Sequence, residues 1–325
     1  MCKIKNYITT HNLLNQNDTI IIGLSGGPDS VFLLHMLVAL RAEYNLTLIA
    51  AHLNHEWRKE ADEEEALCAQ IAQQHAIPFF SAKISQLKHT IKQSGSKEEY
   101  ARKIRRFFLE KVLHERHAQH IALGHHAQDQ QETFFIRLIR GTSLTGLTSM
   151  KPKHGLYIRP LLETNKNDIL AWLTTHNISY AIDSSNESSD FLRNRIRSSV
   201  LPALHECDKR FDANFLSTLQ HLQEDDEYLM RITHQLFDTI TTVINNNRSI
   251  DLKKFFAADK ALYYRLIIHW FITEKVPFQP TQTFLDEIIR FLESPRGGTH
   301  TLHASWRIVK KQQHARIEHI IKSHT

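Results

Sequence analysis

A glycine-rich stretch carries the strongest chemical signal in the chain. It follows a β-branched run at residues 19–24 and opens a segment with helical spacing. Glycines let main-chain N–H groups approach a ligand closely, and the positive end of a following helix attracts anions. The two serines add hydroxyl donors. We therefore expect a pyrophosphate-like anion to bind at the loop formed by Ser25, Gly26, Gly27, Pro28, Asp29 and Ser30.

The aspartate of this loop needs a cation beside it, because a carboxylate that faced a phosphate directly would be repelled. A bridging Mg²⁺ is the natural partner of Asp29. The alternative is a simple helix start, in which Asp29 complements the helix dipole. The loop has neither the Gly-Lys-Ser/Thr ending of a Walker A loop nor the Gly-x-Gly-x-x-Gly of dinucleotide-binding folds. It is therefore a phosphate loop of a different kind.

A pair of carboxylates begins a later helical segment. Asp129 and Glu132 are three residues apart, so on a helix both side chains point the same way. Such a pair can hold a cationic amine or a metal ion, and the alternative is an ordinary acidic first turn. Gly124, His125 and His126 precede the pair at a predicted strand end. We expect these residues to lie near the phosphate loop.

Arginines are grouped in two further segments. Arg102 and Arg105 are one helical turn apart and share a face, which indicates contact with phosphate; the alternative is a solvated basic face. Arg193, Arg195 and Arg197 lie together on a short helical segment. Arginine is favoured where phosphate is bound by two hydrogen bonds at once. We expect both groups to contact phosphate.

Histidines and cysteines give weaker signals for metal binding. His52 and His55 lie at the end of the second predicted strand, but no third ligand is evident nearby, so a polar strand-end loop is favoured over a zinc site. Cys2, Cys68 and Cys207 are far apart in the sequence. They form neither a disulfide framework nor a Cys-x-x-Cys motif.

The elements that must position these residues alternate in type over the first two hundred residues. Apolar or β-branched runs are predicted strands, and longer segments with helical spacing follow them. Such alternation predicts an α/β fold with a doubly wound parallel sheet, and ligands bind such sheets beyond the carboxyl ends of the strands. The predicted strands are residues 19–24, 46–53 and 120–124, and the predicted helices are residues 29–44, 61–75 and 128–140.

The pattern changes after Pro202, and we place a domain boundary near residue 210. Residues 1–210 form the first predicted domain, and residues 211–325 form a smaller, helix-rich α+β domain. Its predicted elements are a polar helix at 211–244, a loop at 245–247, helices at 263–271 and 281–292, and two or three short strands after 298. The tail is basic, and we expect it to grip an RNA backbone through Arg296, Arg307, Lys310, Lys311, Arg316 and Lys322, against the single acid Glu318.

Length and composition limit the number of domains and the class of protein. The 325 residues suggest two domains, at ~150 residues per domain. Apolar residues at 42% and charged residues at 23% argue against a disordered or fibrous protein. The net charge of +5 permits a polyanionic partner without requiring one. No apolar run approaches the ~18 residues of a membrane span, and the N-terminus lacks the apolar core of a secretory signal. We therefore expect a cytoplasmic protein with no membrane partner.

The motifs resemble those of a known enzyme family. The loop SGGPDS is similar to that of the N-type ATP pyrophosphatases, which cleave ATP between its α- and β-phosphates. Over residues 19–205 the chain contains, in the same order, motifs that resemble those of the tRNA(Ile)-lysidine synthetase family, and its length resembles the short form of that family. The motifs that carry this resemblance are SGGPDS, HLNHEWR, EEYARKIRRFF, LGHHAQDQQET, RLIRG with GL, IRPLL, and DSSN with RNRIR.

This resemblance implies a fold of the adenine-nucleotide α-hydrolase type and a two-step reaction. ATP, with Mg²⁺, activates the C2 oxygen of the wobble cytidine in a tRNA(Ile) with a CAU anticodon, and pyrophosphate leaves. The ε-amine of free L-lysine then displaces AMP. The product, lysidine, changes codon reading from AUG to AUA. The resemblance further implies that residues 1–210 are the catalytic domain and that residues 211–325 are a tRNA-binding domain, and it is compatible with a homodimer.

The resemblance also assigns roles. Catalytic roles fall to Asp29, Arg105, Asp129 and Glu132, with Asp29 as the Mg²⁺ ligand. ATP contacts are the phosphate loop with His52, Gly124 and His125. Lysine or tRNA contacts are Arg102, His126, Asp129, Glu132, Arg193, Arg195 and Arg197. The chain departs from the family pattern where Glu56 stands in place of a common glycine, where Gln128 stands for a frequent acid, and where Ser143 stands for a frequent glycine.

Three alternatives remain open from the residues alone. A tRNA thiolase shares the phosphate loop but typically needs cysteine thiolates or an iron–sulfur cluster, and Cys68 and Cys207 lie outside every motif. An amidotransferase-type synthetase needs a nucleophilic cysteine or another ammonia source. A pure RNA-binding module would leave the phosphate loop unexplained.

Overall fold

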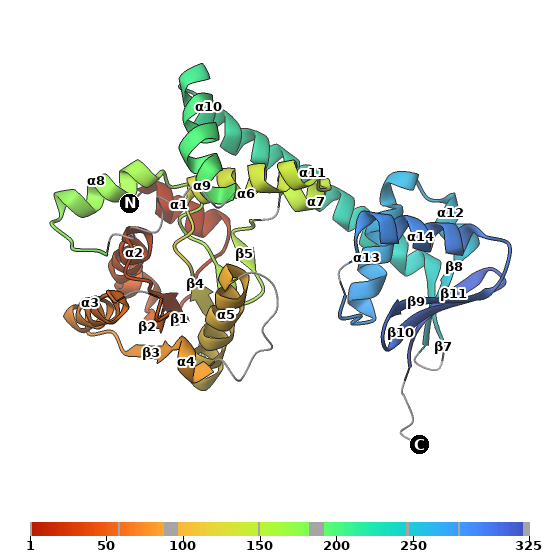
Figure 1. Cartoon of the computed structure of the whole chain (residues 1–325), viewed down its shortest axis with the longest axis horizontal. Helices are drawn as coiled ribbons and strands as arrows, with labels where there is room; N and C mark the ends of the chain where they lie inside the picture. The colour runs from red at the N-terminus through yellow and green to blue at the C-terminus, as the bar shows by residue number, and fades with distance from the viewer. Residues whose placement is uncertain are drawn as a thin grey trace. The chain divides into compact units, whose positions relative to one another are not determined.

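The chain divides into two compact units, residues 1–219 and residues 220–325, and each is described by itself. The computed structural model describes residues 2–57, 59–87, 97–148, 150–181, 192–244, 247–278 and 280–320 (Figure 1). Helix α11 (Phe211–Ile240) begins in the first unit and continues into the second. Arg58, the motif at residues 183–186 and Lys322 lie outside the described residues. Within the described residues, no helix combines the length and apolar character needed to cross a membrane.

The first unit is built on a six-stranded sheet with strand order β3-β2-β1-β4-β6-β5. Neighbouring strands are parallel except for the edge pair of β5 and β6. The three predicted strands are confirmed as β1, β2 and β4, and the other three were not predicted. The strands are β1 (Thr19–Gly23), β2 (Thr47–Asn54), β3 (Phe79–Lys83), β4 (His120–Ala122), β5 (Lys153–His154) and β6 (Tyr157–Ile158).

Helices cover both faces of this sheet, which confirms the doubly wound fold (Figure 1). Side chains alternate along each strand, so Ile20 and Ile22 face one layer and Ile21 faces the other. One layer contains α1 (Cys2–Thr10), α2 (Pro28–Tyr44), α3 (Ala61–Gln74) and α8 (Lys166–Thr175). The opposite layer contains α4 (Ile84–Leu87) and α5 (Lys97–Glu115).

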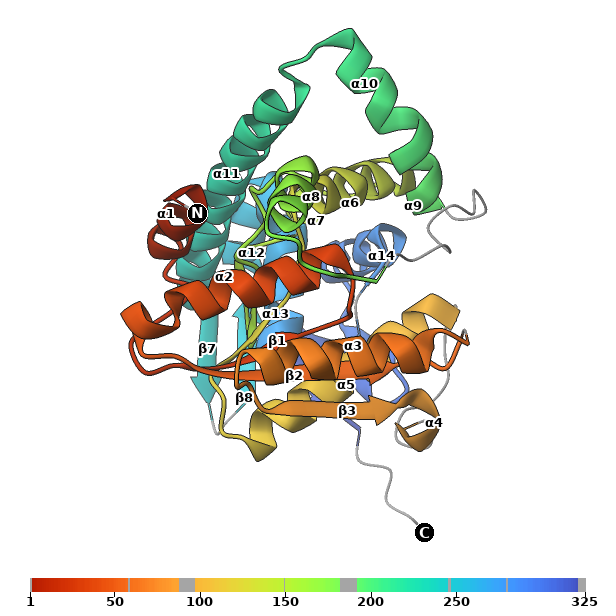
Figure 2. The same ribbon diagram turned by 90° about the vertical axis from the view of Figure 1, so that its left-hand side faces the viewer.

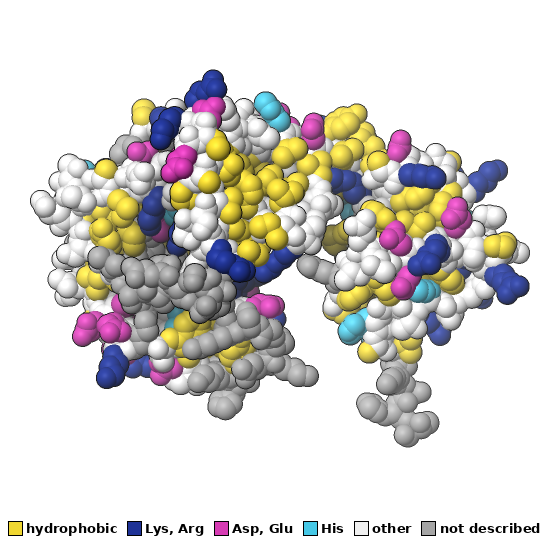
Figure 3. All heavy atoms as spheres, turned by 45° about the horizontal axis from the view of Figure 1, so that its top comes forward, with side chains coloured by type: hydrophobic (Ala, Val, Ile, Leu, Met, Phe, Trp, Pro, Cys, Tyr) yellow, Lys and Arg dark blue, Asp and Glu magenta, His cyan; other side chains and the backbone are white. Residues whose placement is uncertain are grey.

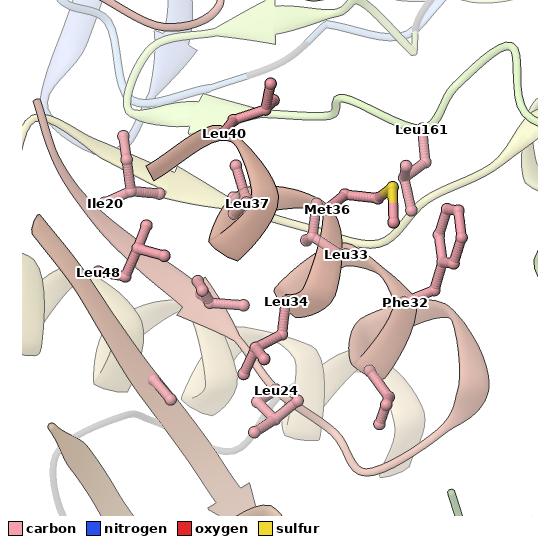
Figure 4. Packing of buried hydrophobic residues seen from close by; sticks show 14 of the residues in the cluster. Ile20, Leu24, Phe32, Leu33, Leu34, Met36, Leu37, Leu40, Leu48 and Leu161 are labelled. Carbon is pink, nitrogen blue, oxygen red and sulfur yellow. The ribbon is translucent and has the colours of Figure 1, made fainter. Parts of the chain in front are cut away.

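Helix α2 is the central helix of its layer and runs alongside β1 and β2 (Figure 2). Its Leu33, Leu34 and Leu37 are fully buried and lie in the same core as Ile20 and Leu48 of the strands (Figure 4). Truncating one such leucine to alanine typically costs 2–5 kcal/mol, roughly, through lost transfer energy and a cavity. This packing fixes the start of α2, and with it the phosphate loop.

The strand order predicts where a ligand binds. From β1 the chain builds outward to β2 and β3, and then returns to the other side of β1 as β4. The carboxyl ends of β1 and β4 therefore flank the point where the winding reverses, which is the usual ligand crevice in such sheets. The phosphate loop follows β1, and the segment beginning at Gly124 follows β4.

A set of helices follows β4 and completes the first unit. Helix α6 confirms the helix predicted at 128–140, and it buries polar residues, among them Gln130, Gln131 and Glu132. Hydrophobic side chains gather on one face of the molecule (Figure 3). Two large hydrophobic side chains of α6, Leu138 and Ile139, are exposed. These elements are α6 (Ala127–Arg140), α7 (Leu144–Leu147), α9 (Leu192–Arg195), the π-helical turn η2 (Ile196–Val200) and α10 (Leu201–Cys207).

The second unit packs helices on a five-stranded antiparallel sheet with order β7-β8-β11-β10-β9. The two predicted helices and the strands of the tail are confirmed. The strands are β7 (Thr241–Ile244), β8 (Asn247–Asp251), β9 (Gly298–His303), β10 (Trp306–Lys311) and β11 (His314–His319). The helices are α12 (Leu252–Ala257), η3 (Lys260–Leu262), α13 (Tyr263–Thr273) and α14 (Gln282–Glu293).

The prediction of one helix over residues 211–244 is wrong at its end. Helix α11 stops at Ile240, and residues 241–244 form β7. These four residues are Thr-Thr-Val-Ile, whose β-branched side chains favour a strand. The predicted loop at 245–247 is shorter than expected, since Asn247 already belongs to β8, and residues 245 and 246 lie outside the described residues.

The basic tail is less open to a polyanion than its sequence indicates. Lys310 is buried, and its Nζ donates to the carbonyl oxygens of Leu292, at 2.5 Å, and Ser294 at the end of α14. The guanidinium groups of Arg307 and Arg316 both donate to the carboxylate of Glu318, at 2.8 and 2.6 Å. Arg296 and Lys311 are exposed.

Candidate functional site

The phosphate loop is closed by its own hydrogen bonds. Ser30 Oγ donates to the Gly27 carbonyl at 2.9 Å and accepts from the Ser25 N–H at 3.0 Å. Ser25 Oγ lies 3.0 Å from Ser30 Oγ, and it is the donor there because the Ser30 proton is already engaged. The serine hydroxyls therefore shape the loop, and their role as phosphate donors stays a prediction.

Backbone conformation explains why the loop needs glycine. Gly26 has φ of +84°, in the left-handed region that side chains disfavour. Gly27 is extended and caps α2, with Pro28 in its first turn. The N–H groups of Asp29 and Ser30 lie in that same turn, where N–H groups have no acceptor within the helix. Those groups and the helix dipole make the start of α2 suited to an anion, as the sequence predicts.

Gly124 brings the second strand-end loop against the first. A β-carbon on Gly124 would lie 2.8 Å from the carbonyl oxygen of Asp29 and 3.1 Å from the Ser30 nitrogen. Only glycine permits this approach without a shift. Gly124, which was predicted to contact ATP, therefore also lets the loop after β4 pack against the phosphate loop.

Asp29 has a cationic neighbour that sequence reasoning missed. Lys166, at the start of α8, places its Nζ 2.5 Å from Asp29 Oδ1. The Nε2 of His126 lies 3.7 Å from the same oxygen. No local signal marks Lys166, because it is 137 residues away in sequence. The described residues hold no group of three metal-ligating side chains, so Asp29 fits Mg²⁺ only as a single carboxylate acting together with substrate phosphates.

The carboxylate pair on α6 lies beside the arginines that follow residue 191. Arg193 donates to both acids, from Nε to Glu132 at 2.6 Å and from Nη2 to Asp129 at 2.9 Å. Arg197 Nε donates to the second oxygen of Glu132 at 2.6 Å. The expected shared face of the pair is present, since one guanidinium spans both carboxylates.

This pairing differs from the contacts expected of these residues, whose substrate roles stay predictions. Glu132 is fully buried and both of its oxygens accept from arginine, so in this arrangement it cannot take an amine from solvent. Arg193 and Arg197 are held by carboxylates, whereas a phosphate partner was expected. Arg195 is exposed on the same segment. A carboxylate–arginine network therefore replaces the open acidic site that the spacing suggested.

Charge and burial tune the ionisable groups of this network. Burial raises the pKa of Asp129, but His126, His125 and Arg193 outweigh it and hold that pKa below its usual value. The backbone N–H of His126 also donates to Asp129 Oδ2 at 3.0 Å. Burial lowers the pKa of His125 to about 4, with Arg159, Arg102 and Arg193 acting in the same direction. Asp129 is therefore charged and His125 neutral near pH 7.

The predicted arginines of α5 lie on the opposite layer from α2 and are exposed. Arg105 Nη2 lies 2.8 Å from His55 Nε2. Because arginine only donates, His55 accepts through Nε2 and is neutral at that nitrogen. Arg102 acts electrostatically on His125 and on Arg159. Arg102 thus acts on residues at the end of β4, while Arg105 faces the end of β2, and the phosphate contact expected of both stays a prediction.

His52 holds the backbone just before the phosphate loop through a hydrogen bond. Its ring is buried, and Nδ1 donates to the carbonyl of Leu24, immediately before the loop, at 2.9 Å. Burial lowers the pKa of His52, so the ring is neutral. The Sγ of Cys68 lies 3.4 Å from the same nitrogen. His52 therefore sets the position of the loop backbone, and His52 and His55 face different partners, as expected for a polar strand-end loop.

In the loop after β2, Glu56 has a left-handed backbone conformation that hydrogen bonds hold in place. Glu56 has φ of +54°, which accounts for the glycine common at this position. Its carboxylate accepts from the N–H of Ser85 at 2.7 Å and from the Ser85 hydroxyl at 2.9 Å. The buried Asn54 accepts from the Glu56 N–H at 2.9 Å and donates to Asp62 and Glu65 of α3. These bonds compensate for the strained backbone.

Comparison with known proteins agrees with this geometry. A family profile described as "PP-loop domain" matches residues 2–204. A protein of Persephonella marina named "tRNA(Ile)-lysidine synthase" is 32% identical over 291 residues, covering 89% of this chain and 63% of that protein. One of Clostridium tetani with the same name is 34% identical over 270 residues, covering 81% and 57%. The chain thus spans about three fifths of the length of these relatives.

A solved structure shows the same fold. The U34-tRNA thiolase NcsA of Methanococcus maripaludis, determined with its [4Fe-4S] cluster, superposes with a TM-score of 0.58 at 20% identity. The match covers 68% of this chain and 79% of that one. At this identity the likeness concerns the fold alone.

Proposed function

The chain belongs to the PP-loop family, and from that premise we propose that it is a tRNA(Ile)-lysidine synthase. In this proposal ATP activates the C2 oxygen of the wobble cytidine in a tRNA(Ile) with a CAU anticodon. The ε-amine of free lysine then replaces AMP at C2. The names of relatives that align over more than four fifths of this chain support it.

One structural observation carries the proposal. The motifs that resemble the lysidine synthetases meet in a continuous set of contacts. From Asp29 of the phosphate loop it passes through His126 and Asp129 to Arg193 and Glu132. A domain that only bound ATP would not need a buried acid–arginine network beside the phosphate loop. This supports a second substrate at the α6 end of the crevice.

The first half-reaction uses the start of α2. Its N–H groups and dipole bind the departing pyrophosphate, and Lys166 beside Asp29 supplies positive charge at the same place. Mg²⁺ held by Asp29 and the phosphates would neutralise charge when bound. Cytidine O2 attacks the α-phosphorus, the bond to the bridging oxygen breaks, and pyrophosphate leaves with the electron pair.

The second half-reaction needs lysine held beside the adenylated cytidine. We assign this role to Asp129, whose side chain is 14% exposed, whereas that of Glu132 is 1% exposed. A carboxylate oxygen can accept more than one hydrogen bond, so Asp129 can hold the lysine ε-ammonium group while Arg193 stays in place. The ammonium group loses a proton to solvent, its nitrogen then attacks C2, and AMP leaves with the electron pair of the C2–O bond. Glu132 then acts as a positioning residue for Arg193 and Arg197. The exposed Arg102 and Arg195 are our candidates for tRNA phosphate contacts.

The thiolase alternative has less support from the cysteines. Cys68 is buried beneath the phosphate loop, and burial raises the pKa of its thiol to about 12. A thiol of that kind does not supply the thiolate that sulfur transfer needs. Among the described residues no cluster of three metal-ligating side chains is present.

The test is product analysis with an unmodified tRNA(Ile) transcript. With ATP and lysine we expect lysidine in the digested tRNA by mass spectrometry, and without lysine we expect adenylated tRNA with one pyrophosphate released. Asp29→Asn should lower pyrophosphate release about a thousandfold, equivalent to about 4 kcal/mol, with an unchanged melting temperature. Thiolated tRNA in the presence of a sulfur donor, or ATP cleavage without change to the tRNA, would contradict the proposal.

A further inference from the structure

One large aromatic side chain near the crevice is exposed. Trp57 follows the end of β2 and is 44% exposed, whereas Trp270, another of the four tryptophans, is fully buried. Exposed tryptophan is uncommon, because burying the indole is among the largest hydrophobic gains a side chain offers. Its place beyond the carboxyl end of a central strand puts it at the edge of the ligand-binding end of the sheet.

The backbone that carries this tryptophan is fixed. Asn54 is buried and bonded to α3, and it accepts from the Glu56 N–H. Glu56 itself is anchored by two hydrogen bonds to Ser85. The residue before Trp57 thus holds a left-handed conformation that the chain stabilises with side-chain contacts on both sides. Because such a loop is already ordered, its aromatic ring loses little conformational entropy when a ligand binds.

The ring is also backed by a neutral histidine and an arginine that donates to it. The centroids of the His55 and Trp57 rings lie 4.9 Å apart with an interplanar angle of 34°. His55 is in turn held by Arg105, whose Nη2 lies 2.8 Å from His55 Nε2. Arg102, one turn away on α5, is exposed beside this group. An aromatic ring next to arginines is the arrangement with which proteins hold single-stranded nucleic acids, since bases stack and phosphates pair.

We propose that Trp57 is a stacking platform for an unpaired nucleobase of the RNA substrate, held in place by His55 and Arg105. This rests on the proposed function and names a contact for the anticodon loop. The base is one next to the reacting cytidine, because the cytidine itself must reach the phosphate loop. The phosphate loop leads into α2, on the other layer of the sheet from α5. That separation favours an RNA base over the adenine of ATP.

The test compares Trp57→Ala and Trp57→Phe in the full chain. With an anticodon stem-loop RNA bearing CAU, at fixed salt, Trp57→Ala should weaken binding about tenfold, as expected for one stacked base. Trp57→Phe should stay within about threefold of the wild type, because phenylalanine keeps a stacking face. Phe107→Ala removes another exposed aromatic ring from α5 and serves as the matched control, with less than a twofold change expected.

Fluorescence supplies the second measurement and separates the outcomes. Adding the stem-loop should quench emission in the wild type more than in Trp57→Phe, and ATP alone should not. Quenching by ATP alone, with a raised KM for ATP in Trp57→Ala, would overturn the proposal in favour of adenine stacking. Unchanged RNA affinity in a folded Trp57→Ala that still forms lysidine would refute the platform and leave the proposed function intact. RNA-dependent quenching without lysidine formation would support the platform and refute the proposed function.

Discussion

Glu132 is fully buried, and each of its oxygens accepts a hydrogen bond of 2.6 Å from an arginine. In Glu132→Gln one of those oxygens becomes an NH₂ group, which faces a guanidinium donor and cannot accept from it. Breaking a buried ion pair by removing one partner costs about 3–5 kcal/mol. The side chains of Arg193 and Arg197 are 32% and 41% exposed and regain water, which reduces this cost. We expect a loss of about 2–3 kcal/mol.

Thermal unfolding and the two half-reactions measure this effect together. At roughly 3 °C per kcal/mol for a unit of this size, the melting temperature should fall by about 6–9 °C. Arg193 spans Glu132 and Asp129, so we expect adenylation and lysine transfer both to decline. Glu43→Gln is the control, because Glu43 pairs with Lys5 at 2.9 Å on the surface, where such pairs contribute little to stability.

Two results would refute this reasoning. A melting temperature within about 1 °C of the wild type would mean that the network does not stabilise the fold. Normal adenylation with only a raised KM for lysine would mean that Glu132 contacts the amine, as its spacing from Asp129 first suggested.

Three further predictions follow from other contacts. Gly124→Ala should reduce pyrophosphate release by roughly a hundredfold, since its β-carbon would lie 2.8 Å from the Asp29 carbonyl oxygen; unchanged kinetics would refute that close approach. Burial, then His75 and His176, lower the pKa of His35 from 6.5 to about 4, so the folded state favours the neutral ring. Stability should therefore fall as pH drops from 6.5 towards 4, by at most about 3 kcal/mol, and unfolding titrations of His35→Gln should lack this component. Lys310→Met should destabilise the second unit by about 1–3 kcal/mol in denaturant titrations, because two carbonyls at the end of α14 lose their donor, whereas Lys311→Met at its exposed neighbour should stay within about 0.5 kcal/mol.

Local patterns determined much of the fold. The runs that became β1, β2 and β4 are short, apolar and β-branched, and the helices after them have helical spacing, so each could be recognised within its own segment. The short edge strands β5 and β6 have two residues each, too few for any periodic pattern. Strand β7 was hidden because its four residues directly continue a long amphipathic helix.

The phosphate loop could also be predicted, because its chemistry is local. A left-handed Gly26 and the start of α2 are properties of neighbouring residues, and together they present N–H groups suited to an anion. The shared face of Asp129 and Glu132 is likewise a consequence of helical spacing. The sequence therefore determined which groups stand at the crevice.

Tertiary structure decided which side chains pair with the charged groups at the crevice. Lys166 meets Asp29 across 137 positions, and Arg193 reaches Asp129 and Glu132 across more than sixty. A charged side chain pairs with whichever opposite charge the packed core brings within about 4 Å, and the Coulomb energy depends on that distance and on the local dielectric, both of which the packing sets. Residue type and local spacing carry no information about it, so a carboxylate pair that could hold an amine proved to hold arginines instead.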